Sequence, residues 1–447
     1  MKKLGFIAVA TLALAGCAED AYLDSNLTDT KALQEIKLGT GAPGASVVTG
    51  RGMGTVGDME GQDANVWKAQ TLKVYSFKRD ADMTSEGNII INNEAATAPT
   101  DENSGAITFA DTKYYPLQGA YHFTGYYTDD ATTGAPTIAA NSITIPITAM
   151  DGTQDVMIAD AKLSTADTTK LVQALITNGK LSGATTDYLD QTTGTGYKTD
   201  ITPDNKALIE AEYVKAFSSY TARREIHPNL VFSHVLSRLV FHVVAGDDEA
   251  MDDGTITVNR TDADQNTTTQ ETLNKGVYVS KVVLNDAISD GTITINNNGS
   301  IAFTAGSTKA DFTLKDIDGT DEGNGLDELT EIKPTSKTDK TRVGESILTA
   351  PAASYTADIT IKQYVDSQDK EITDASSKEK TYPSIPIQLG KDAEGNPLSF
   401  EAGKSYNVVV TVYSNQEIKV TATLTGWVSG GDDIVVSPED DYFNQNP

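Results

Sequence analysis

The amino-acid sequence predicts a mostly β fold. Tyr (18) and Phe (11) carry most of the aromatic content, and Thr, Val and Ile are abundant beside Gly, Asn and Asp. This mixture is typical of strands separated by turns. The segment 71–77 alternates apolar and polar residues, as a strand with one buried face does. Such segments follow one another without intervening helices, which predicts an antiparallel β-sandwich.

The strand candidates fall into two groups on either side of a helical stretch. The first group is 71–77, 89–91, 107–109, 121–127 and 142–148, and the second is 230–244, 277–284, 291–295, 301–303, 347–348, 355–361, 385–389, 406–412 and 418–424. Between them, 169–178 and 206–217 carry apolar residues at helical spacing. We interpret 161–226 as a helical insertion or an interdomain connection. No period repeats along the chain, which argues against a solenoid or a propeller.

The first residues have the pattern of an export signal. Lys2 and Lys3 precede an apolar run over 4–15, and Cys17 follows directly after a glycine. The run of about 12 residues is too short for a hydrocarbon core that requires roughly 20. The basic start and the small residues before Cys17 fit a cleaved signal over 1–17 instead.

Cys17 is the only cysteine of the chain, so no internal disulfide is possible. A lone thiol at the end of an export signal indicates lipid attachment, as in a palmitate-carrying lipoprotein. The alternative is an ordinary signal peptide that contains a cysteine by chance, which leaves a secreted protein with a free thiol. Under the first interpretation the precursor is anchored by lipid in the cell outer membrane.

The segment 18–51 has the features of a propeptide. We expect a short helix over 28–37, stopped by the glycines of 39–44, and then a small apolar run over 45–49. Arg51 follows between two glycines and precedes Gly52 and the first well-patterned strand. A protease must thread extended backbone through its cleft, so this bond is a candidate processing site. The alternative is an ordinary exposed arginine.

Charge excludes several classes of partner. The chain has 63 acidic and 35 basic residues, a formal net charge of −28. Nucleic acid and anionic membrane surfaces repel such a chain. The length allows two to three domains with ample core.

Catalytic and metal-binding patterns are absent from the sequence. His234 and His242 share a strand parity but lie about 26 Å apart in an extended chain, too far to hold one metal ion. We expect these histidines, with His122 and His227, to be structural. The loop 316–322 is rich in aspartate but departs from a calcium-binding loop. We expect no enzyme activity, no cofactor and no bound metal.

Several stretches together resemble the fimbrillin family, the subunits of type V pili. They are the signal ending at Cys17, Arg51, 72–77, 114–116, 152–159 (Gly-Thr-Gln-Asp-Val-Met-Ile-Ala), 232–239 (Phe-Ser-His-Val-Leu-Ser-Arg-Leu), 348–351 and 402–406 with Trp427. They span nearly the whole chain, in the order found in the family.

This resemblance implies two tandem transthyretin-like β-sandwich domains, 52–226 with the helical insertion and 227–447 with the tail. It also implies export as a lipidated precursor, cleavage by an arginine-specific protease at the cell surface, and assembly by strand exchange. The partners are then other pilus subunits, with a host or bacterial surface ligand at the extracellular fimbrium.

Strand exchange has a physical basis in β-sheets. A sandwich that has lost one strand has unpaired backbone groups and an apolar floor, and a neighbour's strand restores both. We expect the run 45–49 to occupy the groove before cleavage. The donor strand is expected at Ile434, Val435 and Val436, a β-prone run between a double glycine and a proline. The alternative for this run is a final edge strand of its own domain.

A second function is compatible with the sequence. The chain is then a monomeric surface lipoprotein adhesin that keeps its lipid anchor, needs no cleavage, and binds glycan or host protein through its loops.

Overall fold

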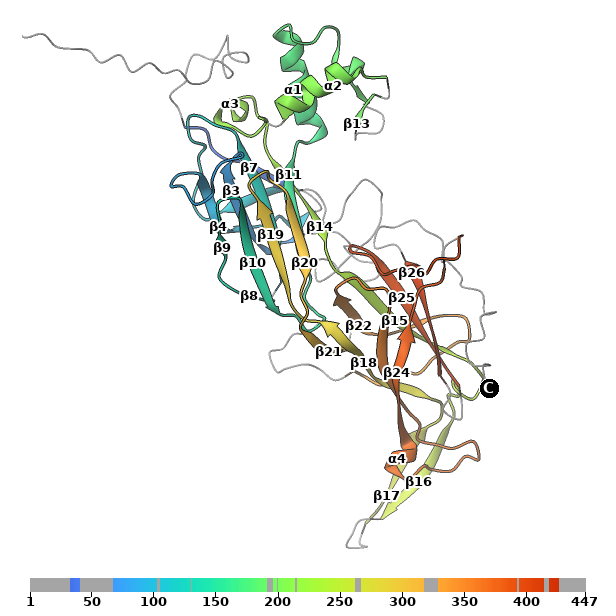
Figure 1. The fold of residues 1–447 in the computed structure, drawn as a ribbon. Helices are drawn as coiled ribbons and strands as arrows, with labels where there is room; N and C mark the ends of the chain where they lie inside the picture. The colour runs from blue at the N-terminus through green and yellow to red at the C-terminus, as the bar shows by residue number, and fades with distance from the viewer. Residues whose placement is uncertain are drawn as a thin grey trace, which may run out of the picture. The chain divides into compact units, whose positions relative to one another are not determined.

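The computed structural model describes eleven segments of the chain. They are 33–40, 67–102, 105–129, 131–190, 196–198, 200–213, 215–261, 267–316, 329–391, 394–413 and 418–425. These segments are mostly β, as the sequence predicts, and they form two compact units (Figure 1). The larger unit draws on residues 37–111, 121–162 and those from 228 onward, and the smaller unit on residues up to 36, 112–120 and 163–227.

The larger unit begins with a closed barrel of seven strands. In barrel order they are β1 (Leu38–Thr40), β14 (Asn229–His234), β11 (Met157–Lys162), β7 (Tyr121–Tyr127), β3 (Thr71–Lys78), β4 (Ile89–Thr97) and β6 (Gly105–Phe109). Four of these match the expected strands at 71–77, 89–91, 107–109 and 121–127. β1 was not expected from the sequence, which predicted a helix over 28–37 that stops just beyond it. The described residues 33–37 are not helical, and Gly39 lies inside a strand.

A second sheet packs against this barrel. Its central strands are β10 (Ser142–Ala149) and β19 (Gly291–Asn296), flanked by β20 (Ile301–Ala305), β8 (Thr132–Thr133) and β9 (Thr137–Ile138). Ile145 of β10 and Tyr75 of β3 belong to one buried apolar cluster, which joins the two sheets. Phe77 and Ile293 belong to the same cluster.

The pairing in these two sheets crosses the expected limit between residues 226 and 227. β10 pairs antiparallel with β19 along six positions, from Ser142 opposite Asn296 to Ile147 opposite Gly291. β14 also lies beyond that limit, yet it pairs with β11 and β1. Strands from the second half of the chain thus complete the first sandwich. Sheet partners are chosen by tertiary packing, which a break in local pattern does not reveal.

Two four-stranded sheets form the second sandwich. One has the order β22 (Thr341–Thr349), β15 (Ser237–Ala245), β25 (Ser405–Val412), β26 (Ile418–Thr425), and the other has β21 (Lys309–Thr313), β18 (Tyr278–Ile288), β23 (Tyr355–Lys362), β24 (Glu379–Ile387). A short helix, α4 (Ala375–Lys378), precedes β24. Most pairs are antiparallel as expected, but β15 and β25 run parallel, as do β1 and β14. Alternate residues of β25, such as Val408 and Val410, are fully buried between the sheets.

Three short two-stranded sheets complete the β structure. β16 (Thr255–Thr261) and β17 (Thr268–Asn274) form a polar hairpin, β2 (Trp67–Lys68) pairs with β5 (Thr100–Glu102), and β12 (Leu189–Asp190) pairs with β13 (Gly196–Tyr197). Most residues of the β16–β17 hairpin are exposed, and Arg260 joins its two strands through Glu271 at 2.7 Å.

The smaller unit contains the helices expected between 161 and 226. They are α1 (Thr165–Thr177), α2 (Pro203–Tyr213) and α3 (Ser219–Ala222), and a short 3-10 turn, η2 (Thr185–Asp187), lies between α1 and α2. Ser164 caps α1 by accepting a hydrogen bond from the Asp167 amide at 3.1 Å. Val172 and Leu175 of α1 pack with Ile209 of α2, so the unit has its own small core. Among the described residues, no helix is long and apolar enough to span a membrane.

Candidate functional site

The strand β1 is the feature of the barrel that suggests a function. It pairs parallel with β14, with Gly39 opposite Asn229, and antiparallel with β6, with Leu38 opposite Ile107. The Gly39 amide donates to the Pro228 carbonyl at 3.0 Å. β6 and β14 are neighbours in the barrel only through β1. Three residues therefore close a seven-stranded sheet.

The side chains of β1 alternate between the inside and the outside of the barrel. Leu38 and Thr40 are 3% and 2% exposed, whereas Lys37 is exposed. The Thr40 hydroxyl donates to the Leu230 carbonyl at 3.0 Å, so its polar atom is satisfied inside. Phe232, two residues further along β14, is also fully buried. Removal of β1 would leave an apolar floor and two unpaired strand edges.

A side chain at Gly39 would have to displace the end of the Asn229 side chain. A Cβ atom at this position would lie 2.9 Å from Asn229 Oδ1 and 3.7 Å from the Gly105 carbonyl. The first distance is shorter than carbon and oxygen normally approach without a hydrogen bond. β1 thus buries Leu38 and Thr40 in the barrel, while Gly39 lies against the Asn229 side chain.

The residues just before β1 are also held by backbone pairing, within the smaller unit. The Ile36 amide donates to the Lys113 carbonyl at 2.8 Å, and the Tyr115 amide donates to the Gln34 carbonyl at 2.9 Å. The segment 34–40 is therefore extended and paired along its length. The alternation of Ile36, Leu38 and Thr40 is the sequence signal that could have indicated this strand, in place of the helix expected over 28–37.

A buried ionisable pair joins two of the motifs that carry the family resemblance. His234 Nδ1 lies 2.8 Å from one carboxylate oxygen of Asp155 and 3.0 Å from the other. Both residues are buried, in the chain leading into β11 and at the end of β14. Met157 is the register partner of His234. The contact fixes the two strands against each other, which supports the expected structural role of this histidine.

The other histidines also lie in structural surroundings. Burial, reinforced by Arg79, lowers the pKa of His122 from 6.5 to about 4, so the ring is neutral inside the fold. His242 is 6% exposed on β15. In the described part of the chain, no group of three or more His, Cys, Asp or Glu is arranged to hold a metal ion.

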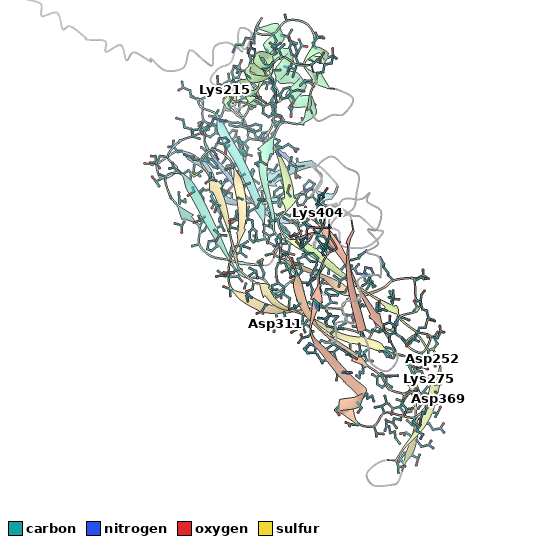
Figure 2. The ribbon with its side chains drawn as sticks, turned by 45° about the vertical axis from the view of Figure 1, so that its right-hand side comes forward. Lys215, Asp252, Lys275, Asp311, Asp369 and Lys404 are labelled. Carbon is teal, nitrogen blue, oxygen red and sulfur yellow. The ribbon has the colours of Figure 1, made fainter. Side chains whose placement is uncertain are left out.

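Charged side chains near the β16–β17 hairpin form exposed ion pairs (Figure 2). Lys275 lies 2.5 Å from Asp369 and 4.0 Å from Asp252, and the Asp369 side chain is 65% exposed. Ion pairs of this kind contribute little to stability because water screens them. We interpret this cluster as a solvated surface.

Several predicted site residues lie outside the described residues. They are Cys17, Arg51, Gly52, Ile434, Val435 and Val436, together with the run 45–49, Trp427 and most of the aspartate-rich loop. The strand that precedes the tail is described as β26, at the edge of its sheet beside β25.

A comparison with solved structures matches this chain to adhesion and fimbrial proteins. A candidate cell adhesion protein from Bacteroides uniformis is 14% identical with a TM-score of 0.41, covering 89% of this chain and 99% of its own. The fimbrial anchor protein Mfa2 from Porphyromonas gingivalis is 10% identical with a TM-score of 0.30, covering 88% and 98%. The tip fimbrial protein Mfa3 from the same organism, truncated at its C-terminus, is 9% identical with a TM-score of 0.33, covering 88% and 100%. No family model and no curated protein matches the sequence.

Proposed function

We propose that this chain is a subunit of a cell-surface fimbria that mediates adhesion. It is exported as a precursor lipidated at Cys17, cut after Arg51 by an arginine-specific protease, and polymerised by donor-strand exchange. One observation carries the proposal. The strand that closes the barrel, β1, lies on the N-terminal side of Arg51, inside the propeptide 18–51.

The geometry explains why cleavage switches assembly on. While β1 is in place, β6 and β14 have partners and the barrel has no free edge here. Loss of 18–51 removes Leu38 and Thr40 from the interior and leaves backbone N–H and C=O groups unpaired on both strands. Buried polar groups without partners cost roughly 1–3 kcal/mol each. A neighbour's strand restores the pairs and covers the apolar floor.

The surroundings of the other arginines support Arg51 as the processing site. Each of them lies on a helix or strand or within two residues of one: Arg79, Arg223, Arg224, Arg238, Arg260 and Arg342. Arg238, for example, donates from Nε to the Ser346 hydroxyl at 3.0 Å across paired strands. A protease binds its substrate as extended backbone, so the local hydrogen bonds of the substrate must break first. Cutting at these positions would therefore disrupt the fold.

The donor is proposed to be the C-terminal tail, at Ile434, Val435 and Val436. β26 ends at Thr425 on the edge of its sheet, so the residues that follow leave from an edge and not from between two strands. In the register of β1, a branched residue at the position of Gly39 displaces the Asn229 side chain, which lies at the groove surface. The donor therefore enters by moving Asn229 or in a shifted register.

Charge sets the conditions for assembly. The first 51 residues hold five basic and five acidic side chains, so the mature chain keeps the whole net charge of −28. Subunits of like charge repel, and salt screens this repulsion with a Debye length of about 8 Å at physiological ionic strength. Assembly is expected to accelerate with salt, because backbone pairing and apolar burial hold the subunits together.

The two sandwiches are proposed to be the tandem transthyretin-like domains of the family. β14 pairs with β11 in the first sandwich and ends at His234, so the boundary between the two domains lies after that residue. The strands β19 and β20 then return to the first sandwich from later in the chain.

N-terminal sequencing of the protein from the cell surface tests the proposal. A mature chain that begins at Gly52, and an Arg51→Ala variant that stays full-length and unpolymerised, are the expected results. Arg260→Ala is the matched control, because it removes an exposed arginine of the hairpin and should not alter processing. A surface protein that begins at Cys17 and functions without cleavage would instead indicate the monomeric lipoprotein adhesin.

A further inference from the structure

The two sandwiches share one pair of continuous strands. β18 of the second sandwich continues into β19 of the first after only two residues, and β21 of the second follows β20 of the first after three. β19 pairs with β20 and β18 pairs with β21, so the same two-stranded ribbon belongs to one sheet of each sandwich. Such a ribbon differs from a flexible linker, because backbone hydrogen bonds on both sides of the joint oppose rotation.

Hydrogen bonds continue the pairing across the joint itself. The Ser289 amide donates to the Thr308 carbonyl at 2.9 Å, and the Gly306 amide donates to the Asp290 carbonyl at 2.9 Å. The Asp290 carboxylate accepts two further bonds from Thr308, from its amide at 2.8 Å and from its hydroxyl at 2.9 Å. Bonds to an ionised carboxylate are stronger than bonds between neutral groups. Asp290 therefore holds the two strands together where each passes from one sandwich to the other.

A loop of the first sandwich makes a second contact with the second sandwich. Residues 150–156 connect β10 to β11, and the Gly152 carbonyl of this loop accepts a hydrogen bond from the Leu348 amide of β22 at 2.7 Å. Gly152 has a φ of +97°, and a Cβ atom there would lie 2.9 Å from Cδ2 and 3.1 Å from Cβ of Phe312 on β21. Phe312 is 1% exposed, and its Cβ is attached directly to the backbone, so it cannot swing aside. Both the backbone conformation and the packing at this position require glycine.

The buried core is also continuous between the sandwiches. One apolar cluster contains Ile145 of the first sandwich together with Phe312 and Ile347 of the second. The chain crosses a third time between β14 and β15 through only two residues, and the Val235 amide in this crossing donates to the Val156 carbonyl at 3.0 Å. Rotation of one sandwich against the other would break these bonds and expose apolar surface to water.

We propose that this joint is a latch that holds the two sandwiches in one fixed orientation, and that Asp290 and Gly152 are the residues that set it. One consequence rests on the proposed function. The acceptor groove belongs to the first sandwich, and the proposed donor tail follows β26 of the second. A fixed joint therefore gives every subunit of a fibre the same angle between its two assembly sites, and tension passes between the sandwiches through paired backbone.

The experiment measures distances between spin labels in the uncut chain by double electron–electron resonance. Cys17 is replaced by Ser, and the labels are carried on cysteines at the exposed positions Thr137 of β9 and Glu379 of β24, one in each sandwich. A second pair of labels, at Thr313 of β21 and Glu379, lies within one sheet of the second sandwich and reports whether that sandwich is intact.

The test variant carries Gly152→Ala and Asp290→Ala, and its matched control carries Gly87→Ala and Asp82→Ala in the turn between β3 and β4. Gly87 also has a positive φ, +78°, but a Cβ atom there meets nothing within 4 Å. Asp82 also accepts bonds from the amide and the hydroxyl of a threonine, Thr84, at 2.8 and 2.6 Å. The control therefore introduces the same backbone strain and removes the same kind of hydrogen bonds away from the joint.

The expected result is one narrow distribution of distances between the sandwiches in the parent protein and in the control. The test variant should give a distribution roughly twofold wider, while the pair within the second sandwich stays narrow in all three proteins. If the test variant broadens both pairs, Asp290→Ala alone must widen the distribution between the sandwiches. A broad distribution in the parent, or equal widths in test and control variants, overturns the inference. The measurement involves neither cleavage nor polymerisation, so its outcome is independent of the proposed function.

Discussion

Substitution of Leu38 by Asp in the uncut chain should release β1 without any protease. The Leu38 side chain is 3% exposed and lies opposite Ile107 of β6. Aspartate at this position places a charge in an apolar interior. The strand is only three residues long, so leaving the barrel costs less than burying that charge.

The size of the effect follows from what holds β1. Burial of a leucine side chain contributes about 1.5–3 kcal/mol, while ordering each backbone residue costs about 1–2 kcal/mol. The backbone hydrogen bonds to β6 and β14 offset the entropic cost of ordering the strand. Burial of Leu38 therefore supplies much of the net stability of the strand. Loss of about 2 kcal/mol corresponds to a roughly 30-fold increase in the open population.

Amide hydrogen exchange of the full-length protein measures this population. Exchange in β6 and β14 should accelerate by about that factor, while β18 and β23 in the second sandwich stay protected. Lys37→Asp is the control, since it places an aspartate on the exposed face of the same segment. Equal protection of β6 and β14 in the two variants would show that burial of Leu38 does not hold the strand.

Four further outcomes are expected. Leu424→Asp should lower the melting temperature and reduce the free energy of unfolding by about 3 kcal/mol or more, because Leu424 lies in register with the buried Tyr406 of β25. An unchanged melting temperature would place Leu424 on the other face of the sheet. Asp155→Ala should destabilise the barrel by about 1–3 kcal/mol in urea unfolding by leaving His234 buried without its acceptor, and a neutral result would refute the structural role of the pair. Because the pKa of His122 falls from 6.5 unfolded to about 4 folded, acid should reduce stability between these values, and His122→Asn should flatten that slope in melts across this range. Deletion of 430–447 should leave a folded, cleavable subunit that forms no fibres by electron microscopy; fibres would place the donor elsewhere, and failure to fold would assign the tail to its own sandwich.

Much of the β structure follows from the sequence alone. The expected strands at 121–127 and 406–412 coincide with β7 and β25 to within one residue. Alternating apolar residues and flanking turn residues are local properties, and a strand buried on one face must satisfy them wherever it lies in the fold. The helices at 169–178 and 206–217 were likewise predicted from the sequence. In the structure the first of them, α1, begins earlier, at Thr165, and the second, α2, ends earlier, at Tyr213.

Only part of the candidate site could be predicted from the sequence. Arg51 and its glycines stand out in the sequence, and the expected run 45–49 lies outside the described residues, but a helix was expected over 28–37. The described residues 33–37 are not helical, and a strand follows them at Leu38–Thr40. A three-residue strand has too few alternations to outweigh a helical pattern beside it. Its stabilising partners are distant in sequence, since Thr40 bonds Leu230 across 190 residues.

The sequence determined most of the longer strands and the faces that they bury. Only the tertiary structure decided which strands are neighbours: that β10 pairs with β19 and that β1 closes the barrel between β6 and β14. Alternation of side chains records the face of a strand that is buried. It does not record its edge partner, because backbone N–H and C=O groups are alike in every residue, and only packing of the whole chain selects between edges.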